Sequence, residues 1–277
     1  MNELFIKGDS LTTLNQLLES IRPKQNEISQ ASTSHNYLRQ LLNSISSNGV
    51  IPPIDTEFLT GSYIRGTKIT PLDDVDLFLV LSPDGLSHYP TGFITRNSTT
   101  VYRNFLDQNG YVSSIKILNA LQSGLSTKYQ TINRENQALN IFLTSYGIGI
   151  DIVPSFKLEN QNYLIPYGHG KNHWLITNPQ KDQEIVEQIN NQTNKVFKDI
   201  IRIIKYWNKK KNYNRLSSYH IEAIGMNIFR YRNDISSYLV GLMLFFNEAK
   251  NYTYNCPDPT GIGDPITSYL EYRQISL

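Results

Sequence analysis

The stretch Gly61-Ser62-Tyr63-Ile64-Arg65-Gly66-Thr67, followed by Asp73-Asp74-Val75-Asp76-Leu77-Phe78-Leu79-Val80, decides the fold class of this 277-residue chain. Glycine lets the backbone turn tightly and approach a ligand, and a helix start offers free N–H groups to phosphate. Residues 77–81 form a continuous apolar run, which is typical of a strand buried on both faces. We therefore expect a phosphate-binding turn at Gly61 and Ser62 directly before a central strand.

Two carboxylates open this strand. Residues i and i+2 of a strand point to the same face, so Asp74 and Asp76 are expected to project together. Neighbouring carboxylates repel each other unless a cation lies between them, and hard oxygen ligands suit Mg²⁺ or Mn²⁺. The pattern predicts a metal site at the start of the strand.

A third carboxylate occurs in Gly149-Ile150-Asp151-Ile152-Val153-Pro154. Aspartate is depleted in strand interiors, so Asp151 between two isoleucines needs a reason. If it lies beside Asp76, the three aspartates could hold two ions, one at an attacking sugar hydroxyl and one at a triphosphate. The simpler alternative is a turn at residues 73–76 and an inward Asp151 paired with a lysine. The joint occurrence of all three segments favours the metal site.

Composition and periodicity predict an α/β chain with two lobes. The hydrophobic fraction of 39%, the charged fraction of 18% and the net charge of +2 are typical of a globular protein without a general nucleic-acid signature. A lone Cys256 fits a reducing, cytoplasmic compartment. We expect a mixed α/β lobe over residues 1–170 and a helical lobe over residues 171–277.

Several elements can be placed by residue range. Apolar spacing predicts a helix over about 26–46, ended by Asn48-Gly49, and another from about Ser113. Residues 139–143 and 148–153 flank a Tyr146-Gly147 turn and predict a hairpin. Residues 82–110 are rich in turn formers, and we expect little regular structure there. Asn178-Pro179 predicts a helix start, and residues 238–246, too short for a membrane span, predict a buried helix.

The helical lobe contains a second group of candidate residues. Lys205 lies on a basic face of the segment 196–209, and Ser218 and Tyr219 follow in a predicted turn. Lys205 and Ser218 could reach triphosphate oxygens while Tyr219 stacks on a base. Each of these residues taken alone has an ordinary structural explanation. Other lysines of the face are expected to be solvated, and His220 is expected in the core.

These segments resemble the nucleotidyltransferase superfamily that unites cyclic GMP-AMP synthase, the 2′-5′-oligoadenylate synthetases and the bacterial dinucleotide cyclases of antiphage defence. The G-S-x-x-R-G-T…D-x-D and I-D-I-V-P-S-F blocks are specific to it, and the block containing Arg65 is its nucleotide-binding segment. Residues 203–207 resemble the synthetase helix whose lysine grips triphosphate. Residues 217–220 are similar to the segment whose serine and tyrosine hold the donor nucleotide, and Asp258-Pro259-Thr260-Gly261 is similar to a C-terminal synthetase loop.

The sequence contains no zinc-binding Cys/His insertion and no long basic run, so it is closest in type to the bacterial cyclic-oligonucleotide synthases of the cyclic GMP-AMP synthase / DncV-like nucleotidyltransferase (CD-NTase) family. The resemblance implies a polymerase-β-like core with a mixed sheet, an N-terminal spine helix and a C-terminal helical bundle, with the active site in the cleft between lobes. It also implies two Mg²⁺ or Mn²⁺ ions bound by Asp74, Asp76 and Asp151. Gly61, Ser62, Arg65, Lys205, Ser218 and Tyr219 would then bind nucleotide.

The expected activity is synthesis of a cyclic di- or trinucleotide from nucleoside triphosphates, with ATP and GTP the leading substrates, in antiphage defence signalling. The alternatives are a linear oligonucleotide product, transfer to RNA or protein, and a non-enzymatic nucleotide-binding antitoxin module. The expected partners are the triphosphates, operon-encoded regulators and a messenger-activated effector. We expect no membrane association and no obligatory nucleic-acid activator.

Overall fold

The computed structural model describes residues 8–89, 93–96, 101–135, 137–168 and 170–267. Contacts divide the chain into two compact units. The sheet unit comprises Ile28–Gly61 and Asp73–Gln180, and the helical unit comprises Met1–Glu27, Ser62–Leu72 and Lys181–Leu277. The contact boundaries fall at residues 27, 61, 72 and 180, and the assignment of functional lobes to 1–170 and 171–277 stays a prediction.

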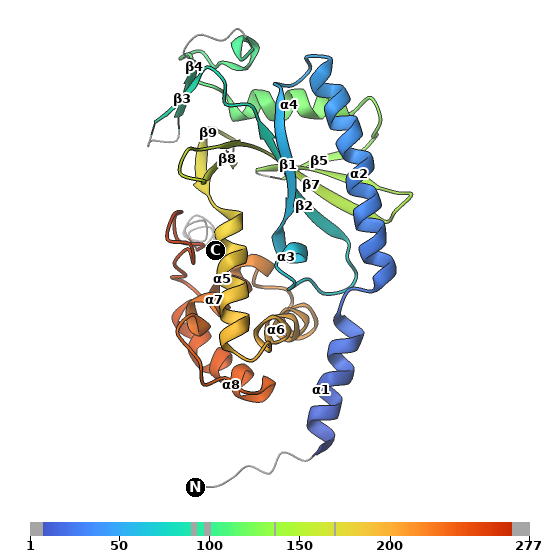
Figure 1. The fold of residues 1–277 in the computed structure, drawn as a ribbon, viewed down its shortest axis with the longest axis vertical. Coiled ribbons are helices and arrows are strands. Elements are labelled where there is room, and N and C mark those ends of the chain that lie inside the picture. Colours follow the sequence, from blue (N-terminus) through green and yellow to red (C-terminus); the bar gives the residue numbers. More distant parts are fainter. Residues whose placement is uncertain (1–7, 90–92, 97–100, 136, 169, 268–277) are drawn as a thin grey trace. The chain divides into compact units, whose positions relative to one another are not determined.

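The sheet unit is built on a seven-stranded mixed sheet (Figure 1). Its main path runs β1-β2-β7-β6-β5, while β8 pairs with β7 and β9 pairs with β8. The pair β2–β7 is parallel, and the other pairs are antiparallel. The strands are β1 (Ile54–Thr60), β2 (Asp74–Leu81), β5 (Ile132–Glu135), β6 (Ala138–Leu143), β7 (Ile148–Lys157), β8 (Tyr163–Gly168) and β9 (Lys171–Thr177).

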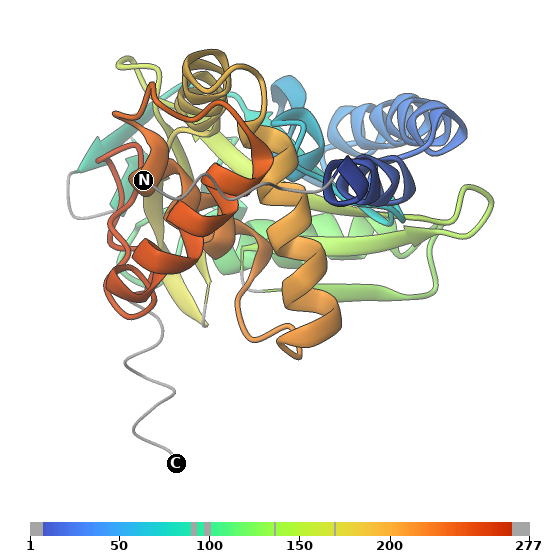
Figure 2. The same ribbon diagram turned by 90° about the horizontal axis from the view of Figure 1, so that it is seen from below.

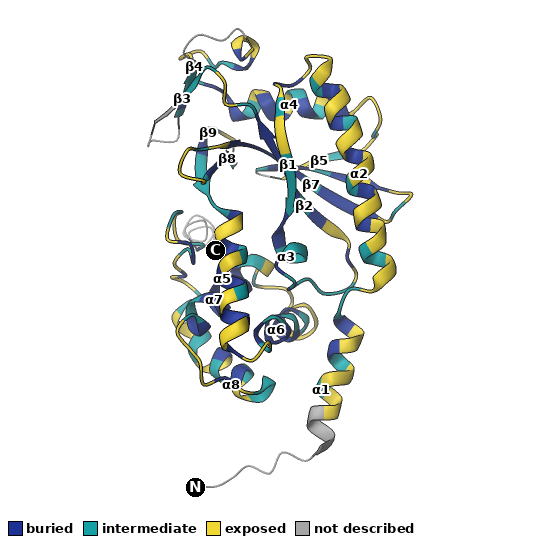
Figure 3. Ribbon diagram, in the orientation of Figure 1, coloured by how far each residue is buried: buried dark blue, intermediate teal, exposed yellow. Residues whose placement is uncertain are grey.

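Strands β2 and β7 are buried because both of their faces carry apolar side chains. All residues from Leu77 to Leu81 are buried, as the apolar run predicted. Figure 3 shows the centre of the sheet in the colour of buried residues. The predicted hairpin of β6 and β7 is confirmed, and Gly147 takes a positive φ of 66° in its turn.

Two helices pack in the sheet unit. The predicted helix near residues 26–46 is α2 (Gln25–Ser47), and the predicted helix from Ser113 is α4 (Ser114–Leu125) with Ser113 as its N-cap. The Arg39 guanidinium of α2 binds Glu57 of β1 at 2.5 Å. This ion pair links α2 to β1.

The expectation of little regular structure over residues 82–110 is wrong in part. Within this segment β3 (Leu86–Tyr89) and β4 (Phe93–Arg96) form an antiparallel pair, and η1 (Arg103–Phe105) follows. Four-residue strands offer too few positions for alternation to stand out from a turn-rich background. Residues 90–92 and 97–100 of this segment lie outside the described residues.

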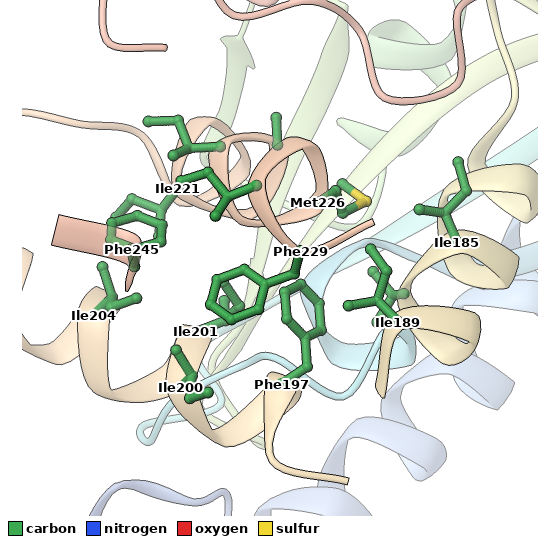
Figure 4. Close-up of a cluster of buried hydrophobic side chains, with 14 of the residues drawn as sticks. Ile185, Ile189, Phe197, Ile200, Ile201, Ile204, Ile221, Met226, Phe229 and Phe245 are labelled. Carbon is green, nitrogen blue, oxygen red and sulfur yellow. The ribbon is translucent and has the colours of Figure 1, made fainter. Parts of the chain in front are cut away.

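The helical unit contains α1 (Gly8–Ile21), α5 (Pro179–Gln192), α6 (Phe197–Lys211), α7 (Ser218–Phe229), α8 (Tyr238–Glu248) and η2 (Ala249–Asn251). Figure 4 shows its core, where side chains of α5, α6, α7 and α8 meet. The rings of Phe197 and Phe229 lie 5.5 Å apart at the centre. In Figure 2, α1 lies beside α6, and Leu18 and Ile21 of α1 pack on Ile203. The short helix α3 (Gly61–Ile64) directly follows β1, and from Ser62 onward it belongs to the segment Ser62–Leu72.

The helix predicted over residues 238–246 is present as α8, but its predicted burial is wrong for one face. Val240, Met243 and Phe246 are exposed by 44%, 56% and 46%. Phe246 instead meets the ring of Trp207, with centroids 5.0 Å apart. A nearly continuous apolar run cannot indicate which of its faces is covered. Among the described helices, none combines the length and apolar character that a membrane crossing requires.

The predicted α/β class, with a mixed sheet, an N-terminal helix and C-terminal helices, is confirmed.

Candidate functional site

A row of polar residues crosses one face of the sheet. Cross-strand pairing places Thr60 opposite Asp76, Asp76 opposite Asp151, and Asp151 opposite Asn140. Asn140 in turn lies opposite Asn133 of β5. Paired residues on neighbouring strands share a face and lie about 5 Å apart. The polar row Thr60–Asp76–Asp151–Asn140–Asn133 therefore spans five strands.

The other face of the sheet is covered by α4. Arg134, the neighbour of Asn133 along β5, points to this second face, and its guanidinium donates a 2.6 Å hydrogen bond to Asn119 of α4. Leu139 and Ile141, the neighbours of Asn140, are fully buried. The polar row lies on the face away from α4 because side chains alternate along each strand.

The polar row brings together two of the three predicted aspartates, Asp76 and Asp151. Asp74 is exposed at the start of β2, while Asp76 and Asp151 are half-buried. Asp74 pairs with Gly149, so it lies one position farther along the same face. The expectation that Asp151 lies beside Asp76 is confirmed by the β2–β7 register.

Asn140 is a site residue that sequence reasoning missed. Its side-chain amide donates a 2.7 Å hydrogen bond to one carboxylate oxygen of Asp151. This bond orients the Asp151 carboxylate through one of its two oxygens. The available signal was an amide inside the apolar strand Ala138–Leu143, since asparagine is depleted in strands.

Gly61 lies against Asp76. Its φ is +75°, a left-handed conformation that glycine adopts readily, and a Cβ placed on it would lie 1.7 Å from an Asp76 carboxylate oxygen. Only a residue without a side chain leaves room for this carboxylate. The glycine expected to allow close ligand approach thus also makes room for a site aspartate.

The helical unit holds a buried ionic network around Glu222. The Arg65 Nε donates a 2.5 Å hydrogen bond to one Glu222 oxygen, and the Lys205 ammonium donates to the other. All three residues are at most 6% exposed. Burial alone would raise the pKa of Glu222, but Arg65 and Lys205 lower it to about 2. Burial lowers the pKa of Lys205, and the nearby charge of Glu222 opposes this effect. The guanidinium of Arg65, which is always charged, helps to keep the Glu222 carboxylate ionised.

Tyr219 extends this network. Its ring centroid lies 5.3 Å from the guanidinium carbon of Arg65, within the range of a cation–π contact. Its hydroxyl donates to Asp182 at 3.0 Å. Burial raises the pKa of Asp182 to about 6, against the opposing effect of Arg65. Neither Asp182 nor Glu222 was among the predicted site residues.

Three further residues with sequence-based predictions are Ser62, Ser218 and His220. The carbonyl of Ser62 accepts the amide N–H groups of Thr67 and Lys68, which closes the turn after α3. Ser218 is exposed at the first position of α7, where Ser217 is the N-cap. His220 is 1% exposed, as expected of a core histidine. The nucleotide-binding roles of Gly61, Ser62, Arg65, Lys205, Ser218 and Tyr219 stay predictions.

The donor set of the sheet suits a hard divalent cation. The neighbouring Asp76 and Asp151 offer carboxylate oxygens of the kind that Mg²⁺ and Mn²⁺ prefer. Within the described ranges, no three His, Cys, Asp or Glu side chains are gathered closely enough to form a metal cluster. The two-ion site at Asp74, Asp76 and Asp151 therefore stays a prediction.

Residues 10–190, which include the whole polar row, match the family model of the Second Messenger Oligonucleotide or Dinucleotide Synthetase (SMODS) domain. The chain belongs to the SMODS family. The predicted resemblance to the bacterial CD-NTases is thereby confirmed.

Curated relatives of this SMODS chain include two synthases. A probable cyclic nucleotide synthase of Bacillus cereus is 33% identical over 231 residues, which cover 77% of this chain and 67% of the relative. A cyclic AMP-AMP-AMP synthase of an Acinetobacter species is 25% identical over 198 residues, covering 70% of this chain and 50% of the relative. The chain therefore spans between half and two-thirds of the length of these two relatives.

The fold of this SMODS chain also resembles solved structures. The structure of E. coli MS115-1 CdnC with ATP superposes with a TM-score of 0.64 and 16% sequence identity, covering 88% of this chain and 73% of that one. At this identity the likeness establishes the fold alone.

Proposed function

We propose that this protein is a nucleotidyltransferase that joins nucleoside triphosphates into a cyclic di- or trinucleotide. The observation that carries the proposal is the register of Asp76 opposite Asp151, with Asn140 bonded to Asp151, in a member of the SMODS family. The names of its curated relatives, a probable cyclic nucleotide synthase and a cyclic AMP-AMP-AMP synthase, support the same class of product.

The proposed reaction is an attack by a sugar hydroxyl of one nucleotide on the α-phosphorus of another. A new O–P bond forms, the bond to pyrophosphate breaks, and pyrophosphate leaves. To close the ring, a free sugar hydroxyl of the linear product loses its proton and attacks the α-phosphorus of the remaining 5′-triphosphate, which releases a second pyrophosphate. Asp74, Asp76 and Asp151 would hold two Mg²⁺ or Mn²⁺ ions, which when bound assist hydroxyl deprotonation and stabilise the phosphoryl charge. Asn140 would orient Asp151 for this task.

In the helical unit, we assign nucleotide binding to Arg65, Lys205, Ser218 and Tyr219. Lys205 is bound to Glu222, so a triphosphate oxygen would have to share the ammonium with that carboxylate. Lysine has three donors, and one pairs with Glu222 while another lies 3.4 Å from the Thr67 hydroxyl. The exposed Ser218 at the start of α7 can offer a further hydroxyl.

The decisive experiment is product analysis. Nuclease-treated protein is incubated with each labelled nucleoside triphosphate, alone and in pairs, with Mg²⁺ or Mn²⁺. A phosphatase-resistant product is expected, because a ring has no terminal phosphate. A product that loses terminal phosphates to phosphatase but keeps its internal phosphodiester bonds would indicate a linear oligonucleotide. Absence of any product would favour the non-enzymatic alternative, and labelled RNA or protein would indicate transfer to a macromolecule.

Regulation is proposed to be independent of nucleic acid. Duplex-dependent activation would need several phosphate contacts, whereas the net charge is +2 and the sequence has no long basic run. The same assay with and without added duplexes, across a salt series, separates the two cases. Strict dependence on duplex that is lost as salt rises would contradict this proposal. A role in antiphage defence, with operon-encoded regulators and a messenger-activated effector, is part of the same proposal.

Replacing Gly61 by alanine should lower nucleotide transfer at least about tenfold. The added methyl group would lie 1.7 Å from the Asp76 carboxylate, so this side chain must move. A misplaced catalytic group of this kind costs on the order of a hundredfold in rate. Steady-state assays on the purified variant give the measurement.

The matched control is Gly110→Ala. Gly110 also has a positive φ, +81°, but a Cβ added there would meet no other group within 4 Å. Both variants carry backbone strain of about 1–2 kcal/mol, and only Gly61→Ala displaces a carboxylate. Equal loss of activity in the two variants would refute the steric role of Gly61.

A further inference from the structure

Phe142 lies on the same sheet face as the polar row and is 52% exposed. It follows Asn140 by two residues on β6, so the two side chains share a face. Its neighbours Ile141 and Leu143 are buried on the opposite face. An aromatic ring thus stands in solvent beside the candidate catalytic carboxylates.

The residue opposite Phe142 is Gly149. Because glycine has no side chain, no cross-strand partner covers the ring from β7. Gly149 is also confined, since a Cβ there would lie 3.1 Å from the Asp73 carbonyl oxygen and 3.4 Å from the Asn140 amide nitrogen. The Phe142 ring is therefore half-exposed, and the residue paired with it on β7 contributes only backbone.

Asp151 is the diagonal neighbour of Phe142, because it lies two residues beyond Gly149 on β7. Diagonal neighbours on one face are about 7–8 Å apart. A nucleoside whose sugar hydroxyl is held at Asp151 places its base roughly one sugar away from that carboxylate. The position of Phe142 on β6 lies at a comparable separation from Asp151.

We propose that Phe142 is the stacking platform for the base of the nucleotide whose hydroxyl attacks, and that Asn133 reads the edge of this base. Asn133 is exposed at the end of the polar row, opposite Asn140. A carboxamide can donate and accept hydrogen bonds, as a base edge requires. Stacking on Phe142 accepts any base, so selectivity among bases resides in Asn133. This subsite rests on the proposed function.

A nucleoside monophosphate is the probe, because it can accept a nucleotide but has no pyrophosphate to release. With labelled ATP as donor and AMP as acceptor, Phe142→Leu should raise the KM for AMP about tenfold and change kcat less than threefold. The basis is the typical stacking energy of about 1–3 kcal/mol per base. Phe142→Trp, which keeps an aromatic ring, should have a KM for AMP within about twofold of wild type. Ribose 5-phosphate, which lacks a base, should serve wild type and Phe142→Leu equally.

The matched control is Tyr37→Leu, which removes a comparably exposed aromatic ring (46%) from α2 in the same unit. Its KM for AMP should stay unchanged. An unchanged KM for AMP in Phe142→Leu, or a loss of thermal stability alone, would overturn the subsite and leave Phe142 as a cover for Gly149. Calorimetric titration with AMP gives the same comparison without turnover. If wild type forms no product yet Phe142→Leu weakens AMP binding, the proposed function fails and the base subsite stands.

Discussion

Replacing Asp76 or Asp151 by asparagine should lower nucleotide transfer by at least about a hundredfold while the fold stays intact. Each change removes one negative charge from a pair that lies in register on neighbouring strands. Charge stabilisation of this kind acts chiefly in the transition state, and loss of one such group typically costs about 10²–10³ in rate. Initial rates with saturating triphosphate and Mg²⁺ or Mn²⁺ give the measurement, with circular dichroism to confirm folding.

The control for this prediction is Asp55→Asn. Asp55 is an exposed aspartate of β1, in the same sheet but outside the polar row. Its replacement should leave the rate within about twofold of wild type. If the double variant of Asp74 and Asp76 keeps its rate within tenfold of wild type, the catalytic assignment of the sheet carboxylates is wrong.

Replacing Glu222 by glutamine should lower the free energy of unfolding by about 3–5 kcal/mol. The change leaves the buried charges of Arg65 and Lys205 without their counter-ion, and breaking a buried pair from one side typically has this effect. Urea titration at pH 7, followed by circular dichroism, measures the difference.

The matched control is Glu187→Gln. Glu187 pairs with Lys198 at the surface of the same unit and is 45% exposed, so its loss should change stability by less than about 1 kcal/mol. Similar effects in the two variants would show that the Glu222 network is no more than a surface ion pair.

The pH dependence gives a second measure of the same network. The pKa of Glu222 is about 2 in the folded protein, below the ordinary value of 4.5. Its stabilising contribution is therefore complete above pH 4.5 and is lost as the pH falls towards 2. The stability difference between wild type and Glu222→Gln should shrink in that window, and a constant difference would contradict the assignment.

Local patterns predicted the parts of the site that lie within single strands. The i, i+2 spacing placed Asp74 and Asp76 together, and the apolar run placed them at the start of a central strand. Asp151 was recognised because a carboxylate between isoleucines is unusual. Asn140 and Glu222 were missed because their roles depend on partners 11 and 157 residues away in the chain. No periodicity encodes such pairings.

Burial was harder to predict than secondary structure. Lys205 was predicted on a basic face as a ligand of triphosphate, and nothing in the sequence indicated that it is 4% exposed and paired with Glu222 of the next helix. The exposed face of α8 could not be predicted, because its sequence is apolar on all sides and gives no sign of which side faces solvent. Strands β8 and β9 were missed because they pair with each other at the end of the sheet, and neither carries a recognisable motif.

The chain passes between the sheet and helical units at four junctions, which limits how recombination can exchange the units between related genes. Each unit is encoded by separated stretches of the gene, so a single recombination breakpoint cannot transplant either one whole. A crossover near residue 180 would bring a foreign α6 and α7 against the resident Arg65, and Glu222 would have to suit a partner inherited from another parent. Substitutions in Ser62–Leu72 and in α7 are therefore expected to be inherited together, as one co-adapted pair of segments.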